Sequence, residues 1–141
     1  YWRSKITSIK RGTTDIRIYC DVPQAGKIVL SASAFSSDGS YTLTIAATGF
    51  TNVTLAVTVL KAPSKLYSAA FNDTVLTLDF YTSTYVTKAE KVFVDGTEVG
   101  FTKSSYYIYV PKSNFTAGVQ HTVTVKATGY GDFITAVTMP Q

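Results

Sequence analysis

The sequence is short of the side chains that most catalytic and metal sites need. Its 141 residues include a single cysteine, Cys20, and a single histidine, His121. One cysteine cannot close an internal disulfide, and no Ser-His-Asp order or paired-carboxylate motif accompanies the histidine. The acidic residues are dispersed, and neither a Cys/His ligand spacing nor a glycine-rich phosphate loop is present. We therefore predict no catalytic residue, no cofactor and no metal, in a chain that is not an enzyme.

Long apolar runs and clusters of positive charge are also missing. No apolar run approaches the roughly 18 residues of a membrane span, so we predict no membrane insertion. The formal charge is +4, but lysine and arginine are scattered singly, with Lys10-Arg11 the only adjacent pair. Because a nucleic-acid site gathers its cations on one face or arm, this dispersal argues against a nucleic-acid partner.

The chain is instead rich in residues that favour β-strands. It has ten tyrosines and eight phenylalanines, with abundant valine and threonine. Along residues 41–47 apolar side chains alternate with threonine or alanine, which predicts one buried and one solvated face. Sheets of this kind pack face to face, so the predicted fold class is all-β, with tandem small antiparallel β-sandwich modules of Ig-like type.

A repeat supports the tandem arrangement. Ala47-Thr48-Gly49-Phe50 returns later in the chain as Ala127-Thr128-Gly129-Tyr130. Residues 41–58 and 121–138 share eight identities in eighteen positions, so the two copies should have the same backbone path. Each glycine is expected to adopt a conformation that a Cβ would oppose, with the following aromatic side chain folded back on the core edge.

The two copies are unequal. We predict a first repeat at residues 1–61 and a second, complete module at residues 62–141, because Pro63 interrupts a strand ladder at the seam. Nothing before Trp2 corresponds to residues 62–84, so the first module lacks its N-terminal strands. Either those strands lie outside this chain or part of the second copy takes their place.

The second copy reads as a series of short strands. Asp95-Gly96 is the clearest hairpin signal, because both residues accept positive φ. A short helical turn is expected at residues 111–115 and again at 31–35. The expected strands cover residues 65–70, 75–80, 91–94, 99–101, 106–110, 121–127 and 132–138.

A series of motifs occurs in order along the second copy: Val92-Phe93-Val94-Asp95-Gly96, Tyr106–Val110, Phe115, Val123–Tyr130 and Val137. With these motifs, the second copy resembles the haemoglobin-interacting domain family of Gram-positive bacterial surface and secreted proteins. The resemblance spans most of residues 62–139, and the first copy fits from Trp2 onward, at an aromatic position of the family that Tyr85 occupies in the second copy. It implies an extracellular β-rich module whose partner is an extracellular protein, with haemoglobin as the named candidate.

Tyrosines are the best candidates for binding residues. Tyr106-Tyr107-Ile108-Tyr109 lie on one expected strand, which sends Tyr106 and Ile108 to one face and Tyr107 and Tyr109 to the other. If Ile108 faces the core, Tyr107 and Tyr109 face solvent, where tyrosine serves well as an anchor for a partner. The alternative is that exposed tyrosines simply stabilise a cross-strand ladder.

Three further aromatic residues complete the candidate list. Tyr81 and Tyr85 have the Tyr-x-x-x-Tyr spacing by which another class of bacterial surface domain ligates haem, although Tyr85 also has a structural role available. Trp2 offers a ring that could stack on a sugar.

The leading hypothesis is a non-catalytic protein-binding module of a bacterial surface or secreted protein. One alternative is a structural spacer or surface-layer assembly domain, since repeat arrays suit that role. The other is a carbohydrate-binding module, for which the partner would be a glycan or the cell wall.

Overall fold

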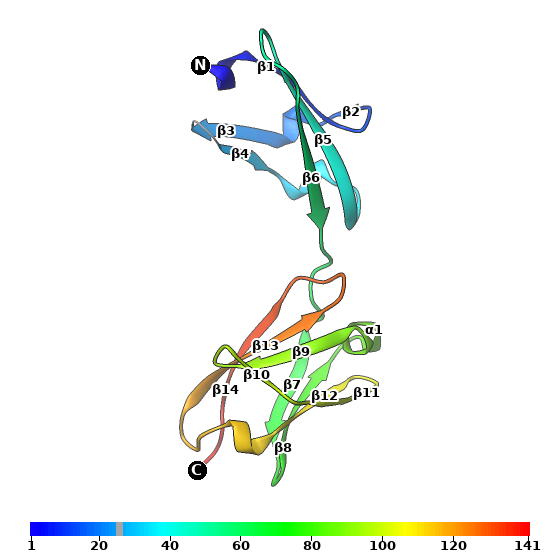
Figure 1. Ribbon diagram of the computed structural model, residues 1–141. Helices are drawn as coiled ribbons and strands as arrows, with labels where there is room; N and C mark the ends of the chain where they lie inside the picture. Colours follow the sequence, from blue (N-terminus) through cyan, green and yellow to red (C-terminus); the bar gives the residue numbers. More distant parts are fainter. Residues whose placement is uncertain (25–26) are drawn as a thin grey trace. The chain divides into compact units, whose positions relative to one another are not determined.

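The structure is a computed structural model that describes residues 1–24 and 27–141 (Figure 1). The chain divides into two compact units, unit 1 (Tyr1–Leu60) and unit 2 (Lys61–Gln141). All strand pairs named in both units are antiparallel. The prediction of an all-β antiparallel fold is therefore confirmed.

Unit 2 consists of two four-stranded sheets. Their strand orders are β10-β9-β13-β14 and β11-β12-β8-β7. The elements in chain order are β7 (Leu66–Phe71), β8 (Val75–Phe80), α1 (Ser83–Thr87), β9 (Ala89–Val94), β10 (Thr97–Val99), β11 (Thr102–Ser104), β12 (Tyr107–Pro111), η4 (Lys112–Asn114), β13 (Gln120–Ala127) and β14 (Phe133–Thr138).

The core of unit 2 lies between these sheets. Strict alternation along β8 buries Leu76, Leu78 and Phe80, because side chains at every second position share a face. The Phe80 ring centroid lies 5.1 Å from that of Tyr85 and 5.0 Å from that of Phe133, so it connects β8, α1 and β14. Sixteen described residues of unit 2 form this buried apolar cluster.

Unit 1 has one complete sheet and a small second one. The strand orders are β2-β1-β5-β6 and β3-β4. The elements in chain order are η1 (Trp2–Lys5), β1 (Ile6–Arg11), β2 (Thr14–Asp15), η2 (Arg17–Tyr19), β3 (Cys20–Gln24), β4 (Lys27–Leu30), η3 (Ala32–Ala34), β5 (Gly39–Ala47) and β6 (Val53–Val59).

The duplicated corner has the same geometry in both units. Gly49 has φ +81° and Gly129 has φ +82°, the left-handed region in which a Cβ is disfavoured. Both units also have a β-bulge beside the repeated strand: between β1 and β5 next to Ile6 in unit 1, and between β9 and β13 next to Ala127 in unit 2. A matching backbone hydrogen bond holds each corner. Thr48 N–H donates to the Lys5 carbonyl at 2.9 Å, and Thr128 N–H donates to the Lys88 carbonyl at 3.0 Å. The predicted common backbone path is therefore confirmed at this corner.

The aromatic residue after each glycine behaves differently in the two units. Tyr130 folds back as predicted, with its ring 5.2 Å from that of the buried Tyr85. Phe50 does not, since it is 43% exposed and its ring lies 6.3 Å from that of Tyr1. At this edge of unit 1, Trp2 is only partly buried, whereas its counterpart Tyr85 in unit 2 is fully buried.

The expected short turns are present as η3 and η4, but other details were not predicted. The first unit opens with η1 and the corresponding part of unit 2 contains α1, where no helix was expected. The predicted strand at 99–101 is wrong in its bounds, because β10 ends at Val99 and a separate short strand, β11, follows. All three residues of β11 are exposed, so it carries no alternating pattern that would reveal a strand.

Candidate binding surface

The strongest candidate surface lies on the outer face of the sheet β11-β12-β8-β7. Ile108 and Val110 on β12 are fully buried, so the alternate positions Tyr107 and Tyr109 point to the other face. The two rings stack with their centroids 6.1 Å apart and an interplanar angle of 26°. Tyr107 is 37% exposed and Tyr109 is half-buried, so the pair forms an aromatic surface rather than part of the core.

Strand register extends this surface across β8. Tyr107 lies opposite Asp79 and Tyr109 lies opposite Thr77, both of which alternate with the buried residues of β8. A carboxylate and a hydroxyl therefore stand beside the stacked rings. Such a mixture of aromatic and polar groups suits contact with a wet protein surface.

A second tyrosine pair lies where β7 begins and β8 ends. A β-bulge interrupts the register between Leu66 and Ser68, and Tyr67 sits within it. Bulges redirect side chains, and here the Tyr67 ring meets that of Tyr81 edge-on, with centroids 5.4 Å apart. These two residues are 66% and 60% exposed. We call Tyr67, Tyr81, Tyr107 and Tyr109 together the tyrosine face.

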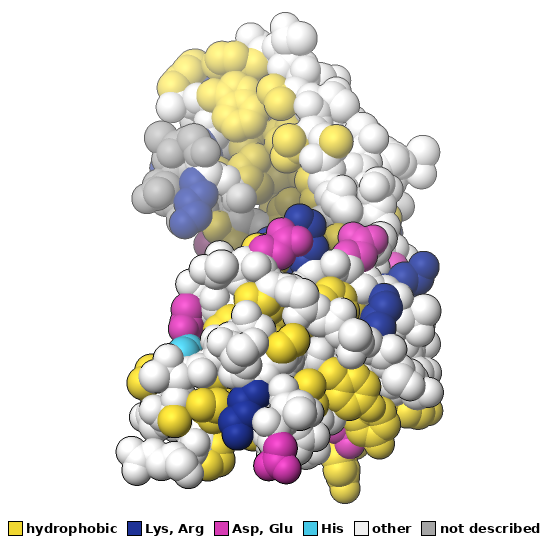
Figure 2. Space-filling model, turned by 60° about the horizontal axis from the view of Figure 1, so that its bottom comes forward, with side chains coloured by type: hydrophobic (Ala, Val, Ile, Leu, Met, Phe, Trp, Pro, Cys, Tyr) yellow, Lys and Arg dark blue, Asp and Glu magenta, His cyan; other side chains and the backbone are white. Residues whose placement is uncertain are grey.

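A shallow groove adjoins this second pair. It has a volume of about 510 Å³ and is lined by the segment 62–65, by Tyr81 and two threonines, and by Tyr130. The Lys61 ammonium lies 5.9 Å from the centre of the Tyr130 ring. On the face of unit 2 that Figure 2 shows, the hydrophobic class of side chains, which includes tyrosine, gathers in patches among polar surface.

The other predicted aromatic residues do not join the tyrosine face. Tyr85 is fully buried, and its hydroxyl donates to the carbonyl of Val125 at 3.3 Å. Burial raises the pKa of Tyr85, which opposes the tyrosinate that haem ligation would need. The prediction of Tyr85 as a binding residue is therefore corrected: the structure gives it the structural role. Trp2 belongs to the core edge of unit 1, so it and the tyrosine face lie in different units.

Tyr106 is exposed, although simple alternation placed it on the core face with Ile108. It precedes β12 and follows Ser105, whose φ of +47° marks a tight turn. The residue is 46% exposed, and its carbonyl accepts the Phe80 N–H. It therefore does not share the core face with Ile108, as simple alternation predicted.

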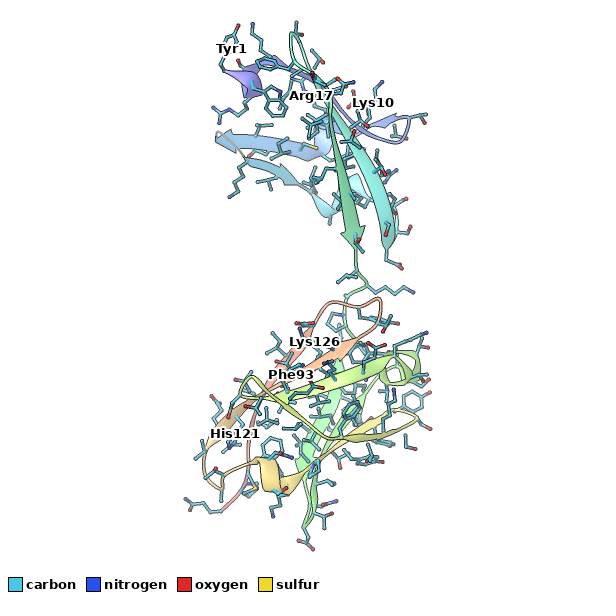
Figure 3. All side chains as sticks on the ribbon, in the orientation of Figure 1. Tyr1, Lys10, Arg17, Phe93, His121 and Lys126 are labelled. Atoms are coloured by element: carbon cyan, nitrogen blue, oxygen red, sulfur yellow. The ribbon has the colours of Figure 1, made fainter. Side chains whose placement is uncertain are left out.

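The single histidine has a structural environment. His121 is buried at the start of β13, and its Nδ1 lies 2.6 Å from Asp95 Oδ2. The Thr116 N–H donates to its Nε2 at 2.9 Å, so the neutral ring donates from Nδ1 to the carboxylate. The Thr122 N–H and His121 together hold the pKa of Asp95 below its ordinary value. The Nδ1 contact and the Thr122 N–H bond to Asp95 tie the Asp95-Gly96 hairpin to β13, while Nε2 holds the segment at Thr116; His121 is labelled in Figure 3.

The described residues contain no group of three or more His, Cys, Asp or Glu side chains arranged to hold a metal ion. In the same part of the chain, none of the helices has the length and apolar character needed to cross a bilayer. A cation and an aromatic ring do meet outside the tyrosine face, where Lys126 Nζ lies 5.6 Å from the centre of the Phe93 ring (Figure 3).

The fold and this surface define the class of protein: a tandem antiparallel β module with aromatic side chains presented on an outer sheet face. Comparison with known families then identifies it. Residues 1–60 and 64–139 match the family described as heme-binding protein Shr-like, Hb-interacting domain. The chain belongs to this Hb-interacting domain family, in two copies, and the resemblance seen in the sequence is confirmed.

Solved structures support the fold alone. The 47-kilodalton lipoprotein Tp47 of Treponema pallidum matches 95% of this chain with 18% identity and a TM-score of 0.50. The Bacteroides ovatus mixed-linkage glucan utilization locus protein SGBP-B, solved with a mixed-linkage heptasaccharide, matches 97% with 17% identity and a TM-score of 0.42, too distant to support an inference. The chain spans 40% and 39% of the lengths of these two structures. No curated protein matches it.

Tyr67 is the one member of the tyrosine face that the sequence did not single out. Its partner Tyr81 directly follows β8, at the far end of the same hairpin. Pairing the strands predicted at 65–70 and 75–80 brings the two positions near each other. The bulge that turns the Tyr67 side chain outward has no signal in the sequence.

Proposed function

We propose that unit 2 binds a haemoprotein, haemoglobin in particular, through the tyrosine face. The support from comparison is the family, whose described role is interaction with haemoglobin. We further propose that the protein acts without catalysis at the surface of a bacterium or after secretion, in keeping with the surface proteins in which such domains occur.

The observation that carries the proposal is the exposure of ordered tyrosine pairs. Tyrosine buries a large ring at a low cost in side-chain entropy, and its hydroxyl can bind a polar group of the partner. The rings of Tyr107 and Tyr109 are already stacked, so their ordering is complete before a partner arrives. In the alignment that places Gly49 on Gly129, the matching positions of unit 1 are Lys27 and Val29, so the stacked pair belongs to unit 2 alone.

The test is a binding titration of the full chain against haemoglobin. The double variant Tyr107→Ala, Tyr109→Ala is expected to weaken binding by about 30-fold or more, since truncating a central anchor costs about 2 kcal/mol. Tyr19→Ala is the matched control, because Tyr19 is 41% exposed but lies in unit 1. Equal affinities for both variants, or no binding by the unaltered chain, would overturn the proposal.

A second arm separates haem from globin. Because Tyr85 is buried with its hydroxyl engaged, we expect the contact to be with the protein surface of haemoglobin. Haem-free globin should therefore compete for binding, whereas free haemin should produce no absorption shift with the chain. A haemin shift that disappears in Tyr81→Ala would instead show that the surface binds the cofactor.

The groove beside Tyr81 favours carbohydrate binding as a second candidate function. Its volume of about 510 Å³, a 60%-exposed tyrosine and two threonine hydroxyls are features on which a sugar ring can stack and form hydrogen bonds. Glycan-array signal lost in Tyr81→Ala but kept in the Tyr107/Tyr109 double variant would support it. If the chain binds neither haemoglobin nor glycans, that result would favour the structural-spacer hypothesis.

A further inference from the structure

Within the described residues, the second sheet of unit 1 has two strands where that of unit 2 has four. The alignment that places Gly49 on Gly129 also places β4 on β12, with Ile28 at the position of Ile108 and Leu30 at that of Val110. In unit 2, β12 lies between β11 and β8. Among residues 1–24 and 27–141, β4 pairs only with β3, so its other edge has no strand beside it (Figure 1).

Unit 1 has an apolar groove with a partly exposed rim of Ile28, Leu30 and Leu55. The other residues that line it, Ile9, Leu43 and Ile45, are buried. Among the described residues, unit 1 has seven in its buried apolar cluster, against sixteen in unit 2. Its groove has a volume of about 290 Å³ and is lined by Ile9, Ile28, Leu30, Leu43, Ile45 and Leu55. Hydrophobic side chains gather around a hollow on the face of unit 1 shown in Figure 2.

Unit 2 shows what covers the corresponding surface. There β8 lies against β12, with Ile108 opposite Leu78 and Val110 opposite Leu76. These leucines and Phe80 are at most 1% exposed, and β7 completes the sheet beyond β8. The β7–β8 hairpin is part of unit 2's own sheet, so it does not take the place of the strands missing from unit 1.

We propose that the groove of unit 1 binds a polypeptide β-hairpin of the β7–β8 type, which adds antiparallel to β4. Its inner strand carries apolar side chains at alternate positions, two of them opposite Ile28 and Leu30. The open edge of β4 supplies backbone hydrogen bonds, and the groove supplies apolar contact on one face of the added strand. This site is independent of the haemoprotein proposal, because it lies in the other unit.

The chemistry of the groove selects this occupant. The six residues that line it are all aliphatic, so it offers no side-chain polar group to a sugar or an anion. An exposed strand edge is a template for another strand, and strands with one apolar face are the form of peptide that fits an edge and a groove together. The repeat fixes the direction and register of pairing as well as the composition.

The test adds a synthetic peptide of residues 65–81 to the full chain and follows amide hydrogen exchange. Exchange at Lys27–Leu30 should slow at least tenfold with saturating peptide, while β12 is unchanged. The matched control is the same peptide with Leu76→Asp and Leu78→Asp, which keeps the length and turn but places charge in the groove. It should give no protection.

A second experiment joins the hairpin covalently to the chain, in case the free peptide does not fold on its own. A chain that carries a second copy of residues 62–83 directly ahead of Tyr1 should unfold, by Trp2 fluorescence, at a higher temperature than the original chain. The same extension with both leucines changed to aspartate should not. Failure of both the peptide and the extension to protect β4 overturns the proposal. Protection that appears without peptide and rises with chain concentration also overturns it, since a second copy would then fill the groove.

Discussion

The sharpest stability prediction compares the same substitution at equivalent positions of the two units. Ile108 is fully buried and lies opposite Leu78, whereas its counterpart Ile28 is half-buried beside the open groove. Ile108→Ala removes three carbon atoms from a closed core and leaves a cavity, so we expect a loss of about 3–4 kcal/mol. Ile28→Ala leaves a space continuous with solvent, so the loss should be about 1 kcal/mol.

Urea titration can measure the two losses separately. The single tryptophan, Trp2, packs at the core edge of unit 1, so its fluorescence follows that unit, and resolved amide signals of β13 follow unit 2. With an m-value of about 1 kcal/mol/M for units of this size, Ile108→Ala should lower the unit 2 midpoint by about 3 M. Ile28→Ala should lower the unit 1 midpoint by about 1 M.

A gentler pair keeps the comparison informative if Ile108→Ala does not fold. Ile108→Val should cost about 1 kcal/mol and Ile28→Val about half of that or less. Equal losses at the two positions would refute the reasoning, because they would mean that Ile28 is covered as completely as Ile108.

Three smaller predictions concern the shared corner, the core and the hairpin. Gly49→Ala and Gly129→Ala should cost the same, about 1–2 kcal/mol in thermal unfolding, because both φ values are near +80° and a Cβ would meet no atom within 4 Å at either position. Tyr85→Phe should cost about 1 kcal/mol in urea unfolding, through loss of the hydrogen bond to the Val125 carbonyl, with haemoglobin affinity unchanged. Because the folded pKa of Asp95 lies below its ordinary value, its contribution to stability is present above about pH 4 and lost as pH falls through the folded pKa. Urea midpoints measured from acidic to neutral pH should therefore fall less steeply with acid in Asp95→Asn.

Much of the fold could be predicted because its signals are local. Alternation along β8 and β13 fixes which face is buried, and Asp95-Gly96 fixes a hairpin with φ values of +48° and +82°. The repeated Ala-Thr-Gly motif likewise predicts a corner that is repeated in the two units. What could not be predicted depends on neighbours in space: α1, the short exposed β11 and the bulge at Tyr67 have no periodic pattern of their own.

Some residues of the candidate site could likewise be placed from the sequence, and others could not. Tyr107 and Tyr109 could be placed together because both lie on one strand, where the alternation of side chains decides their direction. Tyr85 could not be assigned, since the sequence allows either a core position or a haem ligand at its spacing from Tyr81. The packing of α1 against β8 buries Tyr85 and leaves Tyr81 exposed, which only the tertiary structure decides.

The corner of unit 1 bears on how a hairpin could bind there. Its backbone hydrogen bond from Thr48, at 2.9 Å, matches the bond from Thr128 in unit 2, at 3.0 Å, although Phe50 is exposed where Tyr130 is packed. The corner has the same geometry whether or not its aromatic side chain is packed, so the backbone hydrogen bonds to the neighbouring strand and the bulge hold it without a completed core. It follows that the sheet β2-β1-β5-β6 is already in its final register without a second complete sheet. A hairpin that docks on β4 meets a prearranged surface, so most of the ordering cost falls on the hairpin itself, and a hairpin joined in cis should bind far better than one in trans.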